Sequence, residues 1–301
     1  MIYKSHKEVL IMKMHDKCLP CVVNQVIKVA SITGLGKDKK QELLRETFTY
    51  LSKMDFEYVT TPEIIGEIFS MIKRYTNNPD PYKETRNYYN KLFLELLPEF
   101  ERKIEQAENT FQLAIRYAIV GNIIDFNPIH NILLDDIFDI FENVERLELE
   151  IDDSKELMED ILNSKSLLYL GDNCGEICLD KIFIKKIKEL NPNIKIFFGV
   201  RGKPVVNDSI AEDAYSVGIN EYAEIIDNGD GSLGTVLNRT SSEFREIYKN
   251  SDVVIAKGQA NYECLSEENK NIYFLLMSKC DVIANYIGVE EKKLICMKNR
   301  V

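Results

Sequence analysis

The sequence predicts an α/β protein in which an N-terminal all-helical domain, residues 1–165, precedes a C-terminal three-layer α/β domain, residues 166–301, with a mostly parallel sheet. Two observations lead to this prediction. Between residues 18 and 165, apolar side chains recur at spacings of three and four, which is typical of amphipathic helices. After residue 165, short β-branched and aromatic runs alternate with helical stretches, which is the pattern of βαβ units.

The first half contains readable helix starts and stops. Apolar residues at helical spacing between residues 21 and 30 are followed by a stop signal at Gly34 and Gly36. Thr61 and Asp80, each followed by proline, predict N-caps with proline at the first helical position. No run in this half alternates long enough to predict a strand. Further helices are expected over residues 83–97, 99–120, 131–142 and 153–163.

The second half contains five apolar runs that predict strands, and a sixth candidate covers residues 221–226. Helices are expected to start near Glu176, Ser209, Arg239, Tyr262 and Cys280. Strands connected through helices run parallel, so their carboxyl ends meet at one edge of the sheet. The five runs are residues 167–170, 195–200, 252–256, 272–277 and 294–297.

Composition excludes several classes of function. The net charge of −11 argues against a general nucleic-acid-binding protein, because a phosphate backbone requires a basic face. No apolar run reaches the roughly 20 residues that a membrane-spanning helix needs, and residues 1–14 lack the layout of a signal peptide. Seven cysteines, mostly in apolar surroundings, favour reduced thiols. We therefore expect a cytoplasmic protein without nucleic-acid or membrane partners.

The loops after the predicted strands are the informative segments, because ligands of an open parallel sheet bind beyond the carboxyl ends of its strands. Four of these loops are polar and contain glycine: residues 171–176, 201–208, 227–235 and 257–262. Each has an ordinary interpretation on its own, as a turn, a helix cap or a solvated loop. Because all four are expected at the same edge, they predict a single site.

Three residues of these loops have the chemistry of a metal site. Asp172, Asn173 and Asp208 supply two carboxylates and one amide oxygen, which are hard ligands suited to Mg²⁺ or Mn²⁺ and leave positions open for water and phosphate. Lys257 would place a point charge on the phosphoryl oxygens. These residue types indicate a metal-dependent phosphatase for a small phosphorylated metabolite. The nucleophile stays open between a water molecule and a carboxylate that forms an aspartyl phosphate.

Seven segments form an ordered set across both halves. The second half contains Asp172-Asn173-x-Gly175-Glu176, Lys203-Pro204…Asn207-Asp208, Gly234-Thr235 and Lys257-Gly258-x-x-Asn261-Tyr262. The first half contains Cys18-Leu19-Pro20-Cys21, Asp80-Pro81-Tyr82 and Gly121-Asn122-x-x-Asp125. In order and spacing this set resembles the DUF89 family of damage-control phosphatases, also called ARMT1-like, and its compact prokaryotic subfamily in particular. The resemblance covers nearly the whole chain from about Met14.

The resemblance implies a helical domain that caps a Rossmann-like α/β domain and a divalent cation, Mg²⁺, Mn²⁺, Co²⁺ or Ni²⁺, bound by Asp172, Asn173 and Asp208. It implies hydrolysis of phosphate monoesters, such as sugar phosphates or damaged phosphometabolites. Lys257 matches the family's phosphate-contacting lysine, so Asp172, Asp208 and Lys257 are the predicted catalytic residues. The predicted substrate-binding residues are Asn122, Asp125, Glu176, Arg201, Asn207, Gly234, Thr235, Gly258 and Asn261, the first two coming from the helical domain.

Some cysteines and one histidine remain outside this set. Cys18 and Cys21 are open to three interpretations: an independent metal site, a redox pair whose thiol pKa is lowered by the following helix, or a plain helix start. Cys174 would contact a softer metal such as Co²⁺ or Ni²⁺, whereas packing is the expected role of Cys178. His130 is interpreted as a helix-start residue.

Two other classes of function stay open. A Rossmann-type methyltransferase would use the loop at residues 171–176, although that loop lacks a G-x-G-x-x-G pattern. A non-catalytic metabolite-binding protein would have the same pocket without needing a metal.

Overall fold

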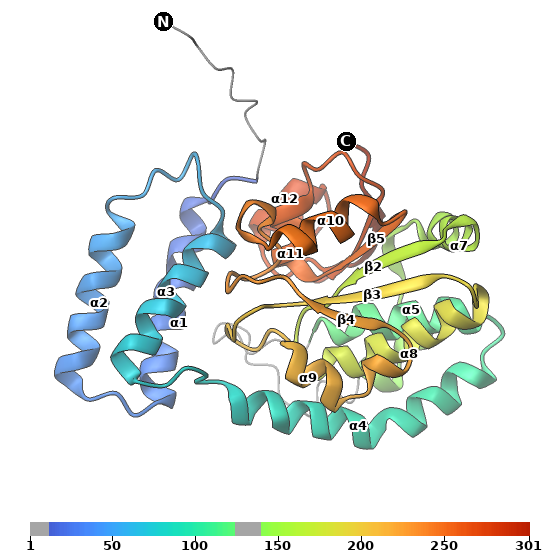
Figure 1. Cartoon of the computed structure of the whole chain (residues 1–301), viewed down its shortest axis with the longest axis horizontal. Coiled ribbons are helices and arrows are strands. Elements are labelled where there is room, and N and C mark those ends of the chain that lie inside the picture. Colours follow the sequence, from blue (N-terminus) through green and yellow to red (C-terminus); the bar gives the residue numbers. More distant parts are fainter. Residues whose placement is uncertain (1–11, 124–139) are drawn as a thin grey trace, which may run out of the picture.

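The computed structural model describes residues 12–123 and 140–301. Within these ranges, a group of helices stands beside a seven-stranded sheet that has helices on both faces (Figure 1). No helix of the described ranges has both the length and the apolar character that membrane crossing requires. The helices of the first half are α1 (Leu19–Ile32), α2 (Lys37–Leu51), α3 (Thr61–Thr76), α4 (Lys83–Gln106) and α5 (Thr110–Gly121), and the short turn η1 (Asp16–Cys18) precedes them.

Helices α1, α2 and α3 form their own apolar core, built from the side chains that the helical spacing predicts to face inward. Val22, Val26 and Val29 of α1 pack there with Leu43 of α2 and Ile68 of α3, all fully buried or nearly so. The loop after β3 (Lys195–Val200) adds Val205 and Val206 to this core. The three helices are thereby held against one edge of the sheet, where Figure 1 shows them.

The cap of α3 lies one residue earlier than predicted. Thr60 is the N-cap: its hydroxyl accepts from the backbone N–H of Glu63 at 3.3 Å, and the Glu63 carboxylate accepts from the backbone N–H of Thr60 at 2.9 Å. This reciprocal pair satisfies two N–H groups that the helix end leaves open. Thr61 is thus free to be the first helical residue, and its side chain faces the cavity described below.

Helix α4 is continuous through Pro98, so the predicted break between residues 97 and 99 is wrong. A proline inside a helix removes one hydrogen bond and costs stability. Leu97 and Phe100, on either side of it, are buried in the core beneath the sheet. Packing of these side chains therefore outweighs the local preference of Pro98.

The start of α4 also differs from the prediction. Tyr82, not Asp80, is the residue before the helix, and Asp80 instead accepts two hydrogen bonds from Arg86, at 2.6 and 2.7 Å. Arg86 also donates to Asp213 at 2.9 Å and is 1% exposed. A buried ion-pair network thus uses the carboxylate that the sequence pattern assigned to a cap.

The sheet has the strand order β1-β7-β6-β5-β2-β3-β4. Strand β6 pairs antiparallel with β7, and the other pairs are parallel, which confirms the predicted mostly parallel sheet. The strands are β1 (Leu149–Asp152), β2 (Ser166–Leu170), β3 (Lys195–Val200), β4 (Glu224–Asp227), β5 (Val253–Lys257), β6 (Ile272–Met277) and β7 (Leu294–Lys298). Two predicted strands coincide with β3 and β6. The strand predicted over residues 221–226 corresponds to β4, which begins three residues later than predicted because the 3-10 turn η3 (Ile219–Glu221) precedes it.

Alternation along the strands divides the apolar side chains between two cores. Leu167 and Tyr169 pack with α5 and α8 (Glu176–Leu190), whereas Leu168 and Leu170 pack on the opposite face. Helices α4, α7 and α9 also lie on the α8 side. Helices α10, α11 and α12 cover the other face. Their bounds are α7 (Ser154–Asn163), α9 (Ala211–Ser216), α10 (Ser242–Asn250), α11 (Gly258–Leu265) and α12 (Asp281–Ile287), with the short turns η2 (Val144–Arg146) and η4 (Leu237–Arg239) between elements.

One strand lies where none was predicted. Strand β1 is only four residues long and alternates between half-buried and exposed positions, so its sequence carries a weak strand signal. It pairs with β7 at the sheet edge. The layers of the α/β part therefore include residues from both sides of residue 166, and the domain boundary at residues 165/166 stays a prediction.

The strand order also locates the crevice where a ligand can bind. From β2 the chain moves outward through β3 and β4, then returns to place β5 on the other side of β2. Leu170 is level with both Gly199 and Ala256, so β2, β3 and β5 end together. Such a reversal of strand order opens a crevice beyond the carboxyl ends of the strands.

Candidate functional site

A cavity of about 170 Å³ lies at this crevice. Its walls come from α1, α3 and α11 and from the loops after β2, β3 and β6. Asp172, Asn173, Asn207 and Asp208 line it on the sheet side. The structure therefore brings the three predicted metal ligands to one cavity, with α1 and α3 closing the opposite side.

Backbone hydrogen bonds hold the two ligand loops together. Asn173 and Asp208 form an isolated antiparallel bridge, and the Ser209 N–H donates to the carbonyl of Asp172 at 2.8 Å. Ile210 bridges to Arg201 in turn. Because residues 208–210 are extended to make these contacts, α9 begins at Ala211 rather than near Ser209 as predicted.

Arg201 clamps the two aspartates from behind. Its Nε donates to Asp208 Oδ2 at 2.7 Å, and its Nη2 lies 3.5 Å from Asp172 Oδ1. The side chain of Arg201 is 1% exposed and does not line the cavity. The predicted role of Arg201 in substrate binding is not apparent in this arrangement, in which it orients the two carboxylates.

Asn122 and Glu176 support the same loop. Asn122 follows α5, and its Nδ2 donates to Asp172 Oδ2 at 3.1 Å and to Glu176 at 3.2–3.3 Å. Glu176 also accepts from Asn173 Nδ2 at 3.0 Å. Asn122 and Glu176 are fully buried and contact the predicted ligands rather than the cavity. Two other sequence candidates, Asp125 and His130, lie outside the described residues.

Lys257 is buried beneath the ligand loops and does not line the cavity, and its predicted contact with a phosphoryl group stays a prediction. Its Nζ donates to the carbonyl of Ala118 at 2.8 Å, to Glu176 at 2.5 Å and to Asp180 at 2.6 Å. Asp180, on α8, also accepts from the Tyr169 hydroxyl at 2.6 Å. Asp180 is not among the residues predicted from the sequence; its position four residues after Glu176, on the same helix face, is the signal that could have found it.

The remaining candidates shape the loops around the cavity. Asn207 lines the cavity and donates to Asn173 Oδ1 at 2.6 Å. Thr235 donates to Asn261 Oδ1 at 2.9 Å, and Asn261 donates to the Lys257 carbonyl at 2.7 Å, so this pair fixes the start of α11. Gly234, at φ +62°, allows close packing: a Cβ there would meet the carbonyl oxygen of Ala260 at 2.4 Å.

Gly258 is the tightest backbone position at the site. It has a φ of +78°, a left-handed conformation that favours glycine. A Cβ at this position would meet Asp172 Oδ2 at 1.9 Å. The first residue of α11 therefore touches a predicted metal ligand, and only glycine leaves room for that carboxylate.

With all its groups ionised, the buried part of the site would carry an excess of two negative charges. Four carboxylates, each 6% exposed or less, face two buried cations. A divalent cation would balance this excess, and the oxygens of two aspartates and one asparagine suit a hard cation. The donor set therefore fits the predicted Mg²⁺ or Mn²⁺. The carboxylates are Asp172, Glu176, Asp180 and Asp208, and the cations are Arg201 and Lys257.

The pKa values of the aspartates reflect this imbalance. Burial raises the pKa of Asp172 well above its ordinary value, and the charges of Asp208 and Glu176 raise it further. Burial also raises the pKa of Asp208, although Arg201 opposes the rise. In the protein without a cation, the site thus disfavours a full set of ionised carboxylates.

Three cysteines share the cavity. Cys18 and Cys21, at the start of α1, and Cys280, after β6, are among its lining residues. Burial raises the pKa of Cys18, so the predicted lowering by the following helix is wrong. Among residues 12–123 and 140–301, no three His, Cys, Asp or Glu side chains form a group that could hold a metal. This gives no support to a separate metal site at Cys18 and Cys21.

Cys174 and Cys178 are fully buried and lie outside the cavity lining. Burial raises the pKa of the Cys174 thiol well above its ordinary value and also raises that of Cys178. Both thiols therefore stay protonated, and the predicted contact of Cys174 with a softer metal is not seen in this arrangement.

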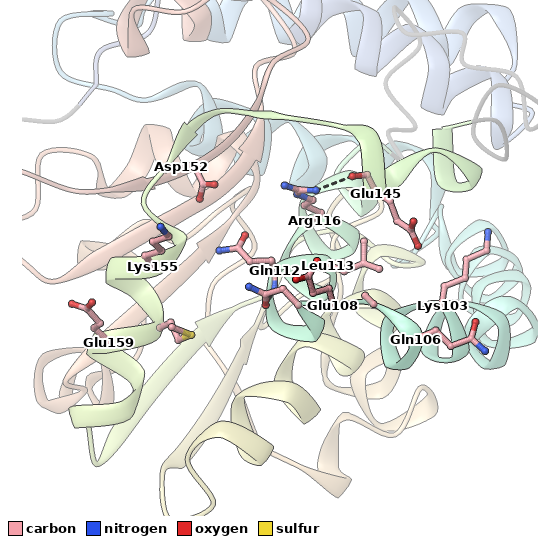
Figure 2. Close-up of a pocket in the computed structure, with 13 residues that line it drawn as sticks. Lys103, Gln106, Glu108, Gln112, Leu113, Arg116, Glu145, Asp152, Lys155 and Glu159 are labelled. Carbon is pink, nitrogen blue, oxygen red and sulfur yellow. Dashed lines mark hydrogen bonds between the residues drawn. The ribbon is translucent and has the colours of Figure 1, made fainter.

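A second cavity, of about 830 Å³, lies between the junction of α4 and α5 and the segment from β1 to α7 (Figure 2). Figure 2 shows Arg116 donating to the carbonyl of Glu145, at 2.9 Å, with Asp152 and Lys155 on another wall. Because β1 runs opposite to β6, Asp152 lies at the amino edge of the main strands. This larger cavity contains none of the predicted site residues, so the smaller one is the candidate active site.

Comparison with known proteins shows the family of the chain. The model of the damage-control phosphatase ARMT1-like domain matches residues 14–295. A damage-control phosphatase of Pyrococcus horikoshii is 32% identical over 291 residues, which cover 96% of this chain and 99% of the relative. A damage-control phosphatase of Archaeoglobus fulgidus is 30% identical over 92% of this chain and 96% of the relative.

A solved structure is also similar to this chain in fold and sequence. The crystal structure of a DUF89 family protein from Pyrococcus horikoshii matches with a TM-score of 0.88 and 31% identity, covering 96% of this chain and all of that one. Fold, extent and identity agree with the resemblance that the sequence motifs suggested. The chain therefore belongs to the damage-control phosphatase, or ARMT1-like, family.

Proposed function

We propose that this phosphatase is a metal-dependent phosphomonoester hydrolase acting on a small phosphorylated metabolite, of the sugar phosphate or damaged phosphometabolite class. The convergence of Asp172, Asn173 and Asp208 on one cavity, above a buried excess of negative charge, carries the proposal. The family match supports a phosphatase over a methyltransferase.

Asp172, Asn173 and Asp208 would hold one divalent cation, Mg²⁺, Mn²⁺, Co²⁺ or Ni²⁺, through their side-chain oxygens. When bound, the cation supplies positive charge that polarises a phosphoryl group and stabilises its developing negative charge. Arg201 keeps both aspartates in place, at 2.7 and 3.5 Å. Asn173 Oδ1 accepts one hydrogen bond from Asn207 and retains a second lone pair for a ligand.

The cavity favours a small substrate. Its volume of about 170 Å³ lies below the usual range of roughly 300–1,000 Å³ for ligand pockets, so it suits a phosphoryl group with a short organic part. Gln25, Thr61 and Gln259 offer hydrogen bonds to hydroxyl groups, whereas Ile65 and Val206 add apolar surface. This mixture is suited to a short polyhydroxylated phosphate ester.

Removal of divalent cations tests the proposal. We expect ethylenediaminetetraacetate treatment followed by buffer exchange to reduce p-nitrophenyl phosphate hydrolysis by about 100-fold or more, because a bound cation contributes several kcal/mol to transition-state stabilisation. Added Mn²⁺ should restore the rate. A protein that retains its full rate after chelation would contradict metal dependence. A protein without hydrolysis under any metal would favour the non-catalytic alternative.

A further inference from the structure

The cavity at the candidate site has walls from two parts of the molecule. Asp172, Asn173 and Asp208 come from loops of the sheet, whereas α1 and α3 belong to the group of helices beside it (Figure 1). If a cation and a phosphoryl group bind at the three predicted ligands, the organic part of the ester must meet the remaining walls. Side chains of α1 and α3 are among those that can contact this organic part.

One stripe of α1 lines the cavity. Cys18, Cys21 and Gln25 belong to the lining, and their spacings of three and four residues place them on one face of the helix. The neighbouring face, with Val22 and Val26, packs in the core of the helical group. Because this packing fixes the rotation of α1 about its axis, the stripe is held at the cavity.

Gln25 supplies a buried amide to this stripe. The residue is 6% exposed, and its Oε1 is buried without a hydrogen-bond partner in the part of the chain that the structure describes. A buried acceptor without a partner costs free energy, so such groups are rare in native proteins. Among the unpartnered buried polar atoms of residues 12–123 and 140–301, Gln25 Oε1 is the one that belongs to the lining of this cavity.

Two other uncharged polar side chains of the lining already have partners. The Thr61 hydroxyl, on α3, hydrogen-bonds to the Glu263 carboxylate, on α11. Gln259, also on α11, accepts from the backbone N–H of Lys279. These contacts join the walls of the cavity to one another. The amide oxygen of Gln25 has no such partner among the described residues, so a molecule bound in the cavity could satisfy it.

The chemistry of the amide indicates which group it would bind. Its oxygen accepts and its NH₂ group donates, and a hydroxyl group does both, so a hydroxyl can pair with the amide in either orientation. A methyl or methylene group would leave the amide without a partner. Gln25 therefore favours a substrate whose organic part bears a hydroxyl group.

We propose that Gln25 is a specificity-determining residue that hydrogen-bonds to a hydroxyl group in the organic part of the substrate. This inference rests on the proposed function. It narrows the substrate class to phosphate esters of hydroxylated carbon chains and excludes simple alkyl phosphates as good substrates. It also assigns this selection to the helical group, outside the loops that contain the predicted metal ligands.

Two phosphate esters with the same carbon skeleton test the proposal. Glycerol 3-phosphate bears hydroxyl groups on its carbon chain, and propyl phosphate bears none. We expect the kcat/KM of the wild-type protein with Mn²⁺ to be higher for glycerol 3-phosphate by about tenfold or more, because a site that hydrogen-bonds a hydroxyl group discriminates against an analogue without it.

Gln25→Met removes the amide and keeps an unbranched side chain of similar length. We expect kcat/KM for glycerol 3-phosphate to fall by about tenfold, the effect of one hydrogen bond, and kcat/KM for propyl phosphate to stay unchanged or rise. The difference in leaving group between the esters is the same for both proteins, so it cancels in this comparison. Gln41→Met is the matched control, because Gln41 is exposed on α2 and outside the cavity lining, and it should leave both values unchanged.

The melting temperature separates recognition from a structural role. Replacement of a buried, unpartnered acceptor by an apolar group should leave the melting temperature of the ligand-free protein unchanged or higher. A structural amide would instead stabilise the fold, so Gln25→Met would melt earlier and lose the same factor in kcat/KM for both esters.

Each outcome bears on a different claim. Equal kcat/KM values of the wild-type protein for the two esters would overturn the proposal, and this measurement does not depend on the folding of a variant. Equal losses for both esters in Gln25→Met would overturn it as well. Wild-type protein that hydrolyses p-nitrophenyl phosphate and not glycerol 3-phosphate would also overturn it, whereas protein that hydrolyses no phosphate ester would contradict the proposed function itself.

Discussion

Asp208→Asn is expected to reduce phosphatase turnover by about 10³-fold or more, because loss of a cation ligand removes several kcal/mol of transition-state stabilisation. Asp208 lines the cavity and holds Arg201 through Oδ2, at 2.7 Å. An asparagine keeps the size of the side chain but lowers the negative charge that attracts a cation. Mn²⁺ affinity of the metal-depleted variant should fall in parallel, as measured by calorimetry.

The fold of this variant should be intact or more stable. Burial raises the pKa of Asp208, although Arg201 opposes the rise, so burial disfavours the ionised carboxylate. Its removal relieves repulsion in a cluster with two excess negative charges, so the melting temperature without metal should not fall. Asp227→Asn is a matched control at the end of β4: Asp227 accepts one backbone hydrogen bond, which an asparagine can also accept. Equal activity losses in the two variants would contradict a specific role for Asp208.

Gly258→Ala is expected to reduce turnover by about 100-fold or more, because misplacement of a reacting group by roughly 1 Å has an effect of this size. The added Cβ would lie 1.9 Å from Asp172 Oδ2, so the carboxylate or the start of α11 must move. The left-handed φ of +78° adds strain of about 1–2 kcal/mol for a residue with a side chain. Turnover, Mn²⁺ affinity and melting temperature should all decrease.

Gly288→Ala separates strain from the steric clash. Gly288 has a φ of +84°, but a Cβ there meets no atom within 4 Å. This control should lose stability by a similar strain energy and retain its turnover and Mn²⁺ affinity. If Gly258→Ala behaves like Gly288→Ala, close contact between α11 and Asp172 does not matter for the site.

The fold was largely predictable because its strands are short, apolar and separated by helices. The predicted helix boundaries are wrong where tertiary contacts outweigh the local sequence signals for a helix start or end. Pro98 does not end α4 because its neighbours are buried, and Asp80 pairs with Arg86 instead of capping a helix. Strand β1 was missed because four half-exposed residues at a sheet edge have little periodicity.

The site was predictable at the level of loops but not of side-chain directions. Asp172, Asn173 and Asp208 follow strands that end side by side, so topology alone brings them together. Lys257 ends a strand as well, yet the last residue of a strand can face either layer. Asp180 belongs to no motif, and apart from its spacing from Glu176 only its contact with Lys257, at 2.6 Å, reveals it.

The position of Mn²⁺ in crystals of metal-depleted protein soaked with Mn²⁺ tests the central claim most directly. Anomalous difference density should show one strong peak in the cavity, with oxygens of Asp172, Asn173 and Asp208 at roughly 2.0–2.6 Å, the range of hard divalent cations. No peak at these residues, or a peak only elsewhere, such as at Cys18 and Cys21, would contradict the account.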